Sequence, residues 1–310
     1  MLVTLSRKGG GASRSAGDKA EIKRLVEEKP QELGRGLAAL KGGLSQLAPL
    51  FQPPHLNRFY NLYVDQLVRE LSGMHAGCSI DGVNVNNISY ANDMVLLSPS
   101  ISALRSLLHV CETYAKVHGL KYNTTKSEIM VFTAGNNSPQ NVPPVRLCGE
   151  ELLRVQQYRY LGHILTEDLK DDQDIERERR ALAVRSNMIA RRFARSSEPV
   201  KLTLFKAFCQ SFYTGSLWVS YKQKTYNALR VQYNNAFRML LGLPWRCSAS
   251  GMFAEARTND FYAIMRKKVT SLMKRVYDSH NNILKVVGGR YECPISNHWT
   301  TVLVKCNEMQ

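Results

Sequence analysis

The stretch ISYANDMVLLS, Ile88 to Ser98, decides how the chain is interpreted, because two β-favouring runs flank the four letters YAND. The outgoing run, Met94 to Leu97, is wholly apolar, which is typical of a strand buried on both faces and therefore central in a sheet. Small and polar residues between the runs predict a tight turn. Carboxylates are preferred ligands of Mg²⁺, but Asp93 has the amide of Asn92 beside it where a second acid would complete a pair. The stretch therefore indicates a metal site, an altered metal site or only a turn.

The residues that follow predict a helix and then a second hairpin. Ser98 is a candidate N-cap, Pro99 suits the first helical position, and Gly119 is a natural stop. The apolar face between them is predicted from helical spacing: Leu104, Leu107, Leu108, Cys111 and Ala115. The segments LKYN and SEIMVF predict paired strands with NTTK turning between them, and two more short strands are expected up to Leu165.

Upstream, RFYNLYVDQLVRELSG predicts a helix that stops at Gly73, with its apolar residues at helical spacing: Phe59, Leu62, Tyr63, Leu67 and Leu71. Residues 1–58 are predicted to be a flexible Gly/Ser-rich arm and a degenerate lead-in. A transit peptide is the alternative for the first residues, because no acid precedes Asp18.

After residue 165 the apolar period becomes helical. In the first of these helices Ile175, Leu182, Ser186, Ile189 and Phe193 are expected on one side. Strands and helices mixed in the first half, followed by helices alone, predict the α+β class with a basic all-helical region at its C-terminal end.

Charge is unevenly distributed along the 310 residues, whose net charge is +16. Residues 175–310 hold 23 Lys+Arg against 8 Asp+Glu, whereas residues 1–174 hold 19 against 18. Such segregation favours a polyanionic partner, most often nucleic acid, over an anionic membrane, and a solvated basic surface is the alternative. No apolar run is long enough to span a bilayer. Seven scattered cysteines without a CxxC pair favour reduced thiols in an intracellular protein of the cytoplasm or nucleus.

Three motifs in consistent order resemble the reverse transcriptase of non-LTR (LINE-type) retrotransposons: SYANDMVLLS, HGLKYNTTKSEIMVF and YRYLGHIL. FYNLYVDQLV upstream and LFKAFCQSFYTGSLWVSY downstream also look like segments of these elements, so the resemblance spans about Phe59 to Ser250. It implies a transposable-element RNA-directed DNA polymerase, a nucleotidyltransferase. The expected parts are a partial palm over 59–165, a helical thumb-like region over 166–250 and a basic helical tail over 251–310.

The resemblance implies three carboxylates that hold Mg²⁺ or Mn²⁺, one on an earlier strand and a pair on the hairpin. Here Asp93 is the remaining hairpin ligand, Asn92 stands at the degenerate position, and the earlier acid has no clear counterpart among candidates such as Asp18 and Asp65. By the same resemblance Tyr90 and Ala91 lie beneath the primer terminus; a cross-strand aromatic and a filler are the alternative.

The resemblance also places an RNA template and a DNA primer on this chain. It puts Lys126 near nucleotide phosphates, and it rests the primer strand on Tyr160, Leu161 and Gly162. Of these, Leu161 is expected in the core either way, and Gly162 is expected to permit close backbone approach. A phosphate backbone could meet Arg191, Arg192 and Arg195. The alternatives are a solvated turn lysine and a charged helix face.

Two other residue sets are weighed and set aside. His163 is expected to be a packed histidine. Cys293, His298 and Cys306 lack a fourth zinc ligand, so zinc is not expected. The sequence thus favours a truncated, catalytically inactive reverse transcriptase domain, a pseudoenzyme. The alternatives are a non-catalytic nucleic-acid-binding module and a retroelement remnant without a selected role.

Overall fold

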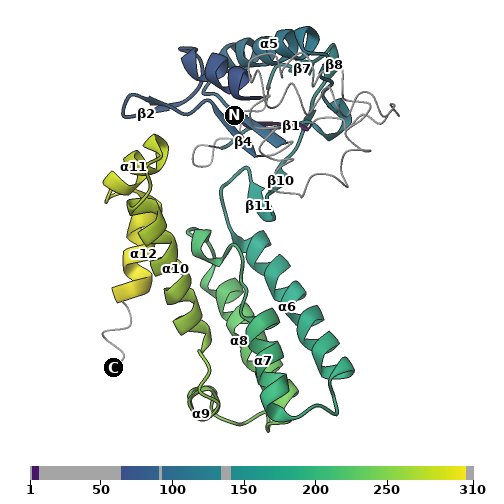
Figure 1. Ribbon diagram of the computed structural model, residues 1–310, viewed down its shortest axis with the longest axis vertical. Coiled ribbons are helices and arrows are strands. Elements are labelled where there is room, and N and C mark those ends of the chain that lie inside the picture. Colours follow the sequence, from purple (N-terminus) through teal and green to yellow (C-terminus); the bar gives the residue numbers. More distant parts are fainter. Residues whose placement is uncertain (1, 7–63, 91–92, 134–140, 305–310) are drawn as a thin grey trace, which may run out of the picture. The chain divides into compact units, whose positions relative to one another are not determined.

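The computed structural model describes residues 2–6, 64–90, 93–133 and 141–304, which form two compact units, Met1–Gln156 and Gln157–Gln310. The first unit mixes strands and helices, and the second is helical apart from one hairpin (Figure 1). The predicted α+β class is therefore confirmed.

A five-stranded sheet organises the first unit, in the order β4-β5-β1-β6-β9. Its strands are β1 (Leu2–Ser6), β4 (Asn87–Tyr90), β5 (Asp93–Leu97), β6 (Glu128–Met130) and β9 (Leu153–Arg154). All neighbouring pairs are antiparallel except β6 with β9. The apolar run of β5 lies between two other strands, with Met94, Val95 and Leu96 all buried, as its composition predicted.

The strand β1 corrects the prediction that the chain begins with a flexible lead-in. Leu2–Ser6 pairs with β5 on one side and with β6 on the other, so it is central in the sheet. Val3 and Leu5 are almost fully buried. A short apolar strand of this kind gains its stability from two partners distant in sequence, and the rest of the predicted arm, residues 7–58, lies outside the described residues.

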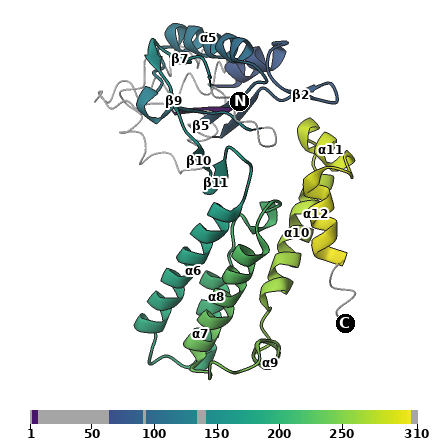
Figure 2. The ribbon, with the colours of Figure 1, turned by 180° about the vertical axis from the view of Figure 1, so that it is seen from behind.

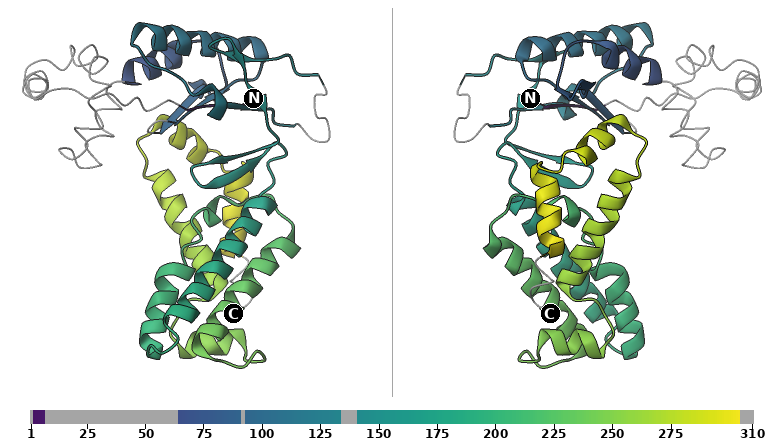
Figure 3. Two further views of the ribbon diagram at one scale, coloured as in Figure 1. Left: turned by 90° about the vertical axis from the view of Figure 1, so that its right-hand side faces the viewer. Right: turned by 90° about the vertical axis from the view of Figure 1, so that its left-hand side faces the viewer.

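Two helices cover one face of this sheet: α5 (Ile101–Val117) and a helix over residues 64–73 (Figure 1, Figure 3). One apolar core joins them to the strands through Leu67, Leu71, Leu104, Leu107 and Leu108, among others. The predicted face of α5 is buried, and α5 ends before Gly119, which has φ +63 as a left-handed helix stop requires. The N-cap is Ser100, not Ser98 as predicted; the Ser100 hydroxyl accepts from the Ala103 N–H at 3.2 Å.

Two asparagines that precede β4 form hydrogen bonds with the C-terminal end of the helix over residues 64–73 and with the residues that follow it. Asn86 is 1% exposed, and its amide donates to the carbonyls of Leu71 and Ala76, the latter at 2.9 Å. Asn84 donates to the carbonyls of Ser72 and Met74 at 3.1 and 2.8 Å. Two of these acceptors, Leu71 and Ser72, are in the last turn of the helix, where carbonyls lack helical partners, and the other two lie just after it. The predicted turn at NTTK is the 3₁₀ helix η1 (Thr124–Lys126). The short pairs are β2 (Ser79–Ile80) with β3 (Val83–Asn84), and β7 (Arg146–Leu147) with β8 (Glu150–Glu151).

The second unit begins with the hairpin β10 (Gln157–Tyr160) and β11 (His163–Thr166) and continues into α6 (Asp172–Arg192). A helical turn η2 (Gly215–Leu217) separates α7 (Glu198–Cys209) from α8 (Gln223–Leu241). The helices α6 and α8 pack along their lengths and run in the same direction, with α7 antiparallel to both (Figure 2). An aromatic-rich core joins them, including Phe205, Phe212, Tyr233, Phe237 and Phe261. Of the residues expected on one side of this helix, Phe193 is its C-cap and is 37% exposed, whereas Ile175, Leu182, Ser186 and Ile189 are buried.

Four further helices complete this unit: α9 (Ala249–Glu255), α10 (Phe261–Tyr277), α11 (Asn282–Gly289) and α12 (Pro294–Val304). Trp299 of α12 is 2% exposed, and its indole N–H donates to the Ser216 carbonyl in η2 at 3.0 Å. Within the described part of the chain, no helix is both long and apolar enough to cross a membrane.

Candidate active-site hairpin and a buried charge network

The YAND hairpin is built from β4 and β5, whose register pairs Tyr90 with Asp93. Ala91 and Asn92, the two residues between that pair, lie outside the described residues. Tyr90 is 61% exposed, and Asp93, the first residue of β5, is also exposed, while the next three residues are buried. The strand is therefore buried in the core except at the hairpin tip, where one carboxylate lies at the surface.

The strand beside Asp93 supplies no second carboxylate at that level. Ser6, the last residue of β1, is the register partner of Asp93. Asp65 forms an ion pair with Arg69 on its own helix, at 2.7 Å, and Asp18 is outside the described residues. In the described ranges, no set of three or more His, Cys, Asp or Glu side chains could hold a metal ion. Mg²⁺ prefers several hard, charged oxygen ligands, so the described residues beside Asp93 do not fit it.

Lys126 lies at the same end of the sheet as Asp93. Because β6 runs antiparallel to β1, the residues just before β6 lie where β1 ends, and η1 contacts β1. Lys126 is the last residue of η1 and is exposed. The register thus brings Asp93, Ser6 and Lys126 to one edge of the first unit.

The YLG motif forms the turn of the β10–β11 hairpin, in the second unit. Tyr160 pairs with His163, which leaves Leu161 and Gly162 as the two turn residues, at φ 46 and 88. Positive φ at both positions is the requirement of a type I′ turn. Leu161 is 42% exposed, so its predicted core position is wrong. Gly162 serves the turn through its positive φ, and a Cβ there would meet only the Tyr213 ring at 3.8 Å.

Arg191, Arg192 and Arg195 are all exposed at the C-terminal end of α6. The structure thus keeps this predicted basic group together in the second unit. The residues weighed for zinc diverge: Cys293 donates to the Ser296 hydroxyl at 3.1 Å, His298 packs edge-on against Tyr221, and Cys306 lies outside the described residues.

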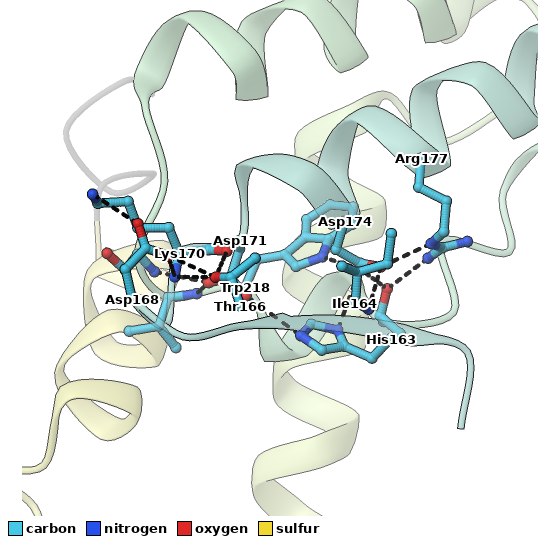
Figure 4. A network of polar contacts seen from close by, with 12 residues as sticks. His163, Ile164, Thr166, Asp168, Lys170, Asp171, Asp174, Arg177 and Trp218 are labelled. Carbon is cyan, nitrogen blue, oxygen red and sulfur yellow. Dashed lines mark hydrogen bonds and ion pairs between the residues drawn. The ribbon is translucent and has the colours of Figure 1, made fainter. Parts of the chain in front are cut away.

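A buried charge network centred on Asp174 joins α6 to the β10–β11 hairpin and to the segment between α7 and α8 (Figure 4). Asp174 is fully buried on the apolar face of α6. Its Oδ1 accepts from the Ile164 N–H at 3.0 Å and from Arg177 Nε at 2.8 Å. Its Oδ2 accepts from the Thr214 hydroxyl at 2.6 Å and the Trp218 indole at 2.8 Å. Burial alone would raise the pKa of this carboxyl, but these donors and the nearby charge of His163 hold the pKa well below its usual range.

His163 links the hairpin to two carboxylates at the start of α6. Its Nδ1 lies 3.2 Å from Asp174 Oδ2, and its Nε2 lies 3.5 Å from Asp171 Oδ1. Burial disfavours the charged imidazole, but the two carboxylates outweigh burial and raise the pKa of His163 to about 9. Asp171 also accepts from the N–H groups of Val219 and Ser220 at 2.7 and 2.9 Å, which fixes the segment before α8. The prediction that His163 is packed agrees with its 13% side-chain exposure.

A second buried acid, Glu178, lies one turn further along α6. It contacts Arg185 Nη2 at 2.6 Å and Arg177 Nη1 at 3.4 Å. Burial lowers the pKa of Lys268 on α10, and Glu178 partly offsets that effect. Sequence periodicity placed apolar residues on this face of α6 but missed both acids. The available signal was the i, i+4 spacing of Asp174 and Glu178 in phase with Ile175 and Leu182.

The comparisons with known proteins agree with the resemblance over part of the chain. No curated protein matches the sequence. A matched segment that covers about a third of the chain includes the first unit from residue 64 onward and the β10–β11 hairpin up to Leu165. That segment, residues 58–165, matches the family described as reverse transcriptase (RNA-dependent DNA polymerase).

Proposed function

We propose that the chain is a reverse transcriptase domain derived from a non-LTR retrotransposon and that it does not add nucleotides. The family match over residues 58–165 supports the descent. The order of the YAND, GLKYN and YLG motifs supports the non-LTR origin. Residues 59–165 then correspond to a partial palm, 166–250 to a thumb-like region and 251–310 to a basic tail.

One observation carries the proposed inactivity: Ser6 is the register partner of Asp93. The resemblance calls for a carboxylate on an earlier strand next to the hairpin, and β1 is the strand that lies next to β5. The residue types at these two positions are serine and asparagine, and neither carries the negative charge of a carboxylate. Each lost ligand charge costs several kcal/mol of transition-state stabilisation, and each ~1.4 kcal/mol is tenfold in rate. Under this proposal Asp93 holds Mg²⁺ or Mn²⁺ only weakly.

Primer extension on a poly-A template tests this proposal directly. The full chain is assayed with Mg²⁺ and with Mn²⁺, beside an active reverse transcriptase on the same template. We expect no extension from the chain, and clear extension would refute the proposal. Asn92→Asp alone should not restore extension, since Ser6 still stands opposite Asp93. If that single substitution did restore it, the missing earlier carboxylate would not be the cause.

The second proposed function is nucleic-acid binding without catalysis, and the charge of the C-terminal region favours it. Residues 175–310 carry a net +15, and Arg191, Arg192 and Arg195 are exposed together. Under the descent proposed above, the bound molecule would be RNA or single-stranded DNA, on surfaces that include Lys126 and the turn at Leu161 and Gly162. The two proposals are compatible, because binding needs no metal.

Salt dependence is the test of binding. Affinity for a labelled oligonucleotide is measured by fluorescence anisotropy across a series of salt concentrations. Binding through phosphate contacts predicts a steep linear fall of log K with log salt. No binding at low salt, or binding indifferent to salt, would count against this function. Cooperative unfolding of the purified chain would separately argue against a remnant without a defined fold.

A further inference from the structure

Trp245 is the one tryptophan among the described residues that the fold leaves at the surface. It is 78% exposed, whereas Trp218 and Trp299 are 1% and 2% exposed. The guanidinium carbon of Arg246 lies 4.7 Å from the centroid of the Trp245 ring. At that exposure the cation–π contact leaves much of the indole surface open to a further flat partner.

The segment that carries Trp245 is held in place by bonds to α8. The Cys247 N–H donates to the Pro244 carbonyl at 3.0 Å, so Trp245 and Arg246 are the two central residues of a turn. Arg238 donates to the Cys247 carbonyl from Nη2 at 2.8 Å and from Nε at 3.3 Å. The turn is therefore fixed before any partner binds, which lowers the entropy cost of binding.

The end of the helical group that carries this turn is rich in positive charge. Because α6 and α8 run in the same direction, the end of α6 and the turn after α8 lie at one end of the group (Figure 2, Figure 3). The cationic residues at this end include Arg191, Arg192, Arg195, Lys201, Arg238 and Arg246, and the acids near it include Glu198 and Glu255. Basic residues in the last turn of a helix also favour its dipole, which explains Arg191 and Arg192 but not Arg195 or Arg246.

We propose that the Pro244–Cys247 turn and the adjacent C-terminal end of α6 bind single-stranded nucleic acid. In this site Trp245 stacks on a base, and Arg246, Arg195 and the arginines ending α6 contact phosphates. Aromatic faces on which bases stack, together with positive charge that meets the phosphates, bind single strands with little sequence preference. A duplex keeps its bases stacked inside and cannot use the indole in this way. The site rests on the proposed nucleic-acid binding and locates part of it.

Trp245→Ala in the full chain tests the stacking step. Its affinity for a single-stranded oligonucleotide of about 16 nucleotides, DNA and RNA in separate arms, is compared with that for the same sequence as a duplex. We expect about tenfold weaker binding of the single strand and little change for the duplex. Tyr291→Ala is the matched control, since Tyr291 is 73% exposed elsewhere in the same unit; its single-strand affinity should stay at that of the wild type.

A charge pair tests the phosphate step. Arg195→Gln should reduce the slope of log K against log salt by about 1, whereas Lys285→Gln, with the same charge change on α11, should leave the slope unchanged. Equal affinities of Trp245→Ala and Tyr291→Ala, or equal slopes of the two charge variants, would overturn the site. If the wild type binds and these variants match it, only this inference fails. If the wild type itself does not bind at low salt, the proposed binding function fails with it.

Discussion

The ion pairs of His163 predict how the stability of the second unit depends on pH. The folded state raises the pKa of His163 from 6.5 to about 9. This contribution to stability is fully present below pH 6.5 and is lost as pH rises through about 9. The shift corresponds to about 3 kcal/mol, and solvent screening at the partly accessible ring reduces it to about 2 kcal/mol.

Comparing the wild type with the variant His163→Gln isolates the contribution of His163 to the free energy of unfolding. Other groups that titrate at high pH are present in both proteins, so their effect cancels. The free energy of unfolding is measured in urea by tryptophan fluorescence at several pH values from 6.5 to about 10. The three tryptophans, Trp218, Trp245 and Trp299, all lie in Gln157–Gln310, so the signal reports that unit alone. We expect the wild type to exceed the variant by about 2 kcal/mol more at pH 6.5 than at pH 10. Parallel curves for the two proteins would refute the assignment of charge to His163.

Three more substitutions can be measured by the same unfolding assay. Asp174→Asn should cost about 3–5 kcal/mol, because it leaves buried positive partners uncompensated, whereas Asp172→Asn, two residues away, should cost about 1 kcal/mol; equal costs would contradict the network. Gly162→Ala should cost roughly 1–2 kcal/mol, since an alanine is strained at φ +88, while Gly251→Ala inside α9 should be neutral or stabilising; a neutral Gly162→Ala would show that the turn relaxes. Trp299→Phe should cost about 1–3 kcal/mol through the lost bond to the Ser216 carbonyl, and an unchanged midpoint would mean that α12 contributes little.

The sequence predicted correctly the elements that are determined by residues close to one another in the chain. The apolar run after Asp93 gave a central strand, and helical spacing gave the buried face of α5. Both depend on side chains a few residues apart, which a sequence displays directly. The predicted N-cap, Ser98, is two residues away from the actual one, Ser100. The two side chains are chemically equivalent, so the backbone conformation determines which serine caps the helix.

Two features could not be predicted because their causes are distant in sequence. In the sequence Leu2–Ser6 is only a short, mostly apolar run. It forms a strand because it pairs with β5 and β6, which lie far away in the chain. Asp174 reads as a solvated acid on a charged helix. Its burial depends on His163 before α6 and on Thr214 and Trp218 after α7, and no local period connects these positions.

The candidate site also has one part that the sequence predicted and one part that it did not. Sequence alone located Asp93 at a hairpin tip and an amide beside it. The candidates for the earlier acid in the sequence were Asp18 and Asp65, whereas the residue in register with Asp93 is Ser6. Register across a sheet is set by pairing and by burial of one face, so it becomes visible only when the strands are assembled.

The central position of β1 also affects the order in which the first unit can assemble. The strand is synthesised before both of its partners, since β5 follows about 90 residues later and β6 later still. Closing so long a loop costs about 4 kcal/mol of chain entropy before the pairing contributes stability. On the ribosome, an apolar segment remains unpaired until most of the first unit has emerged. Synthesis rate and early chaperone contact are therefore expected to influence the yield of folded chain, and deleting residues 2–6 would leave β5 and β6 without the strand that joins them.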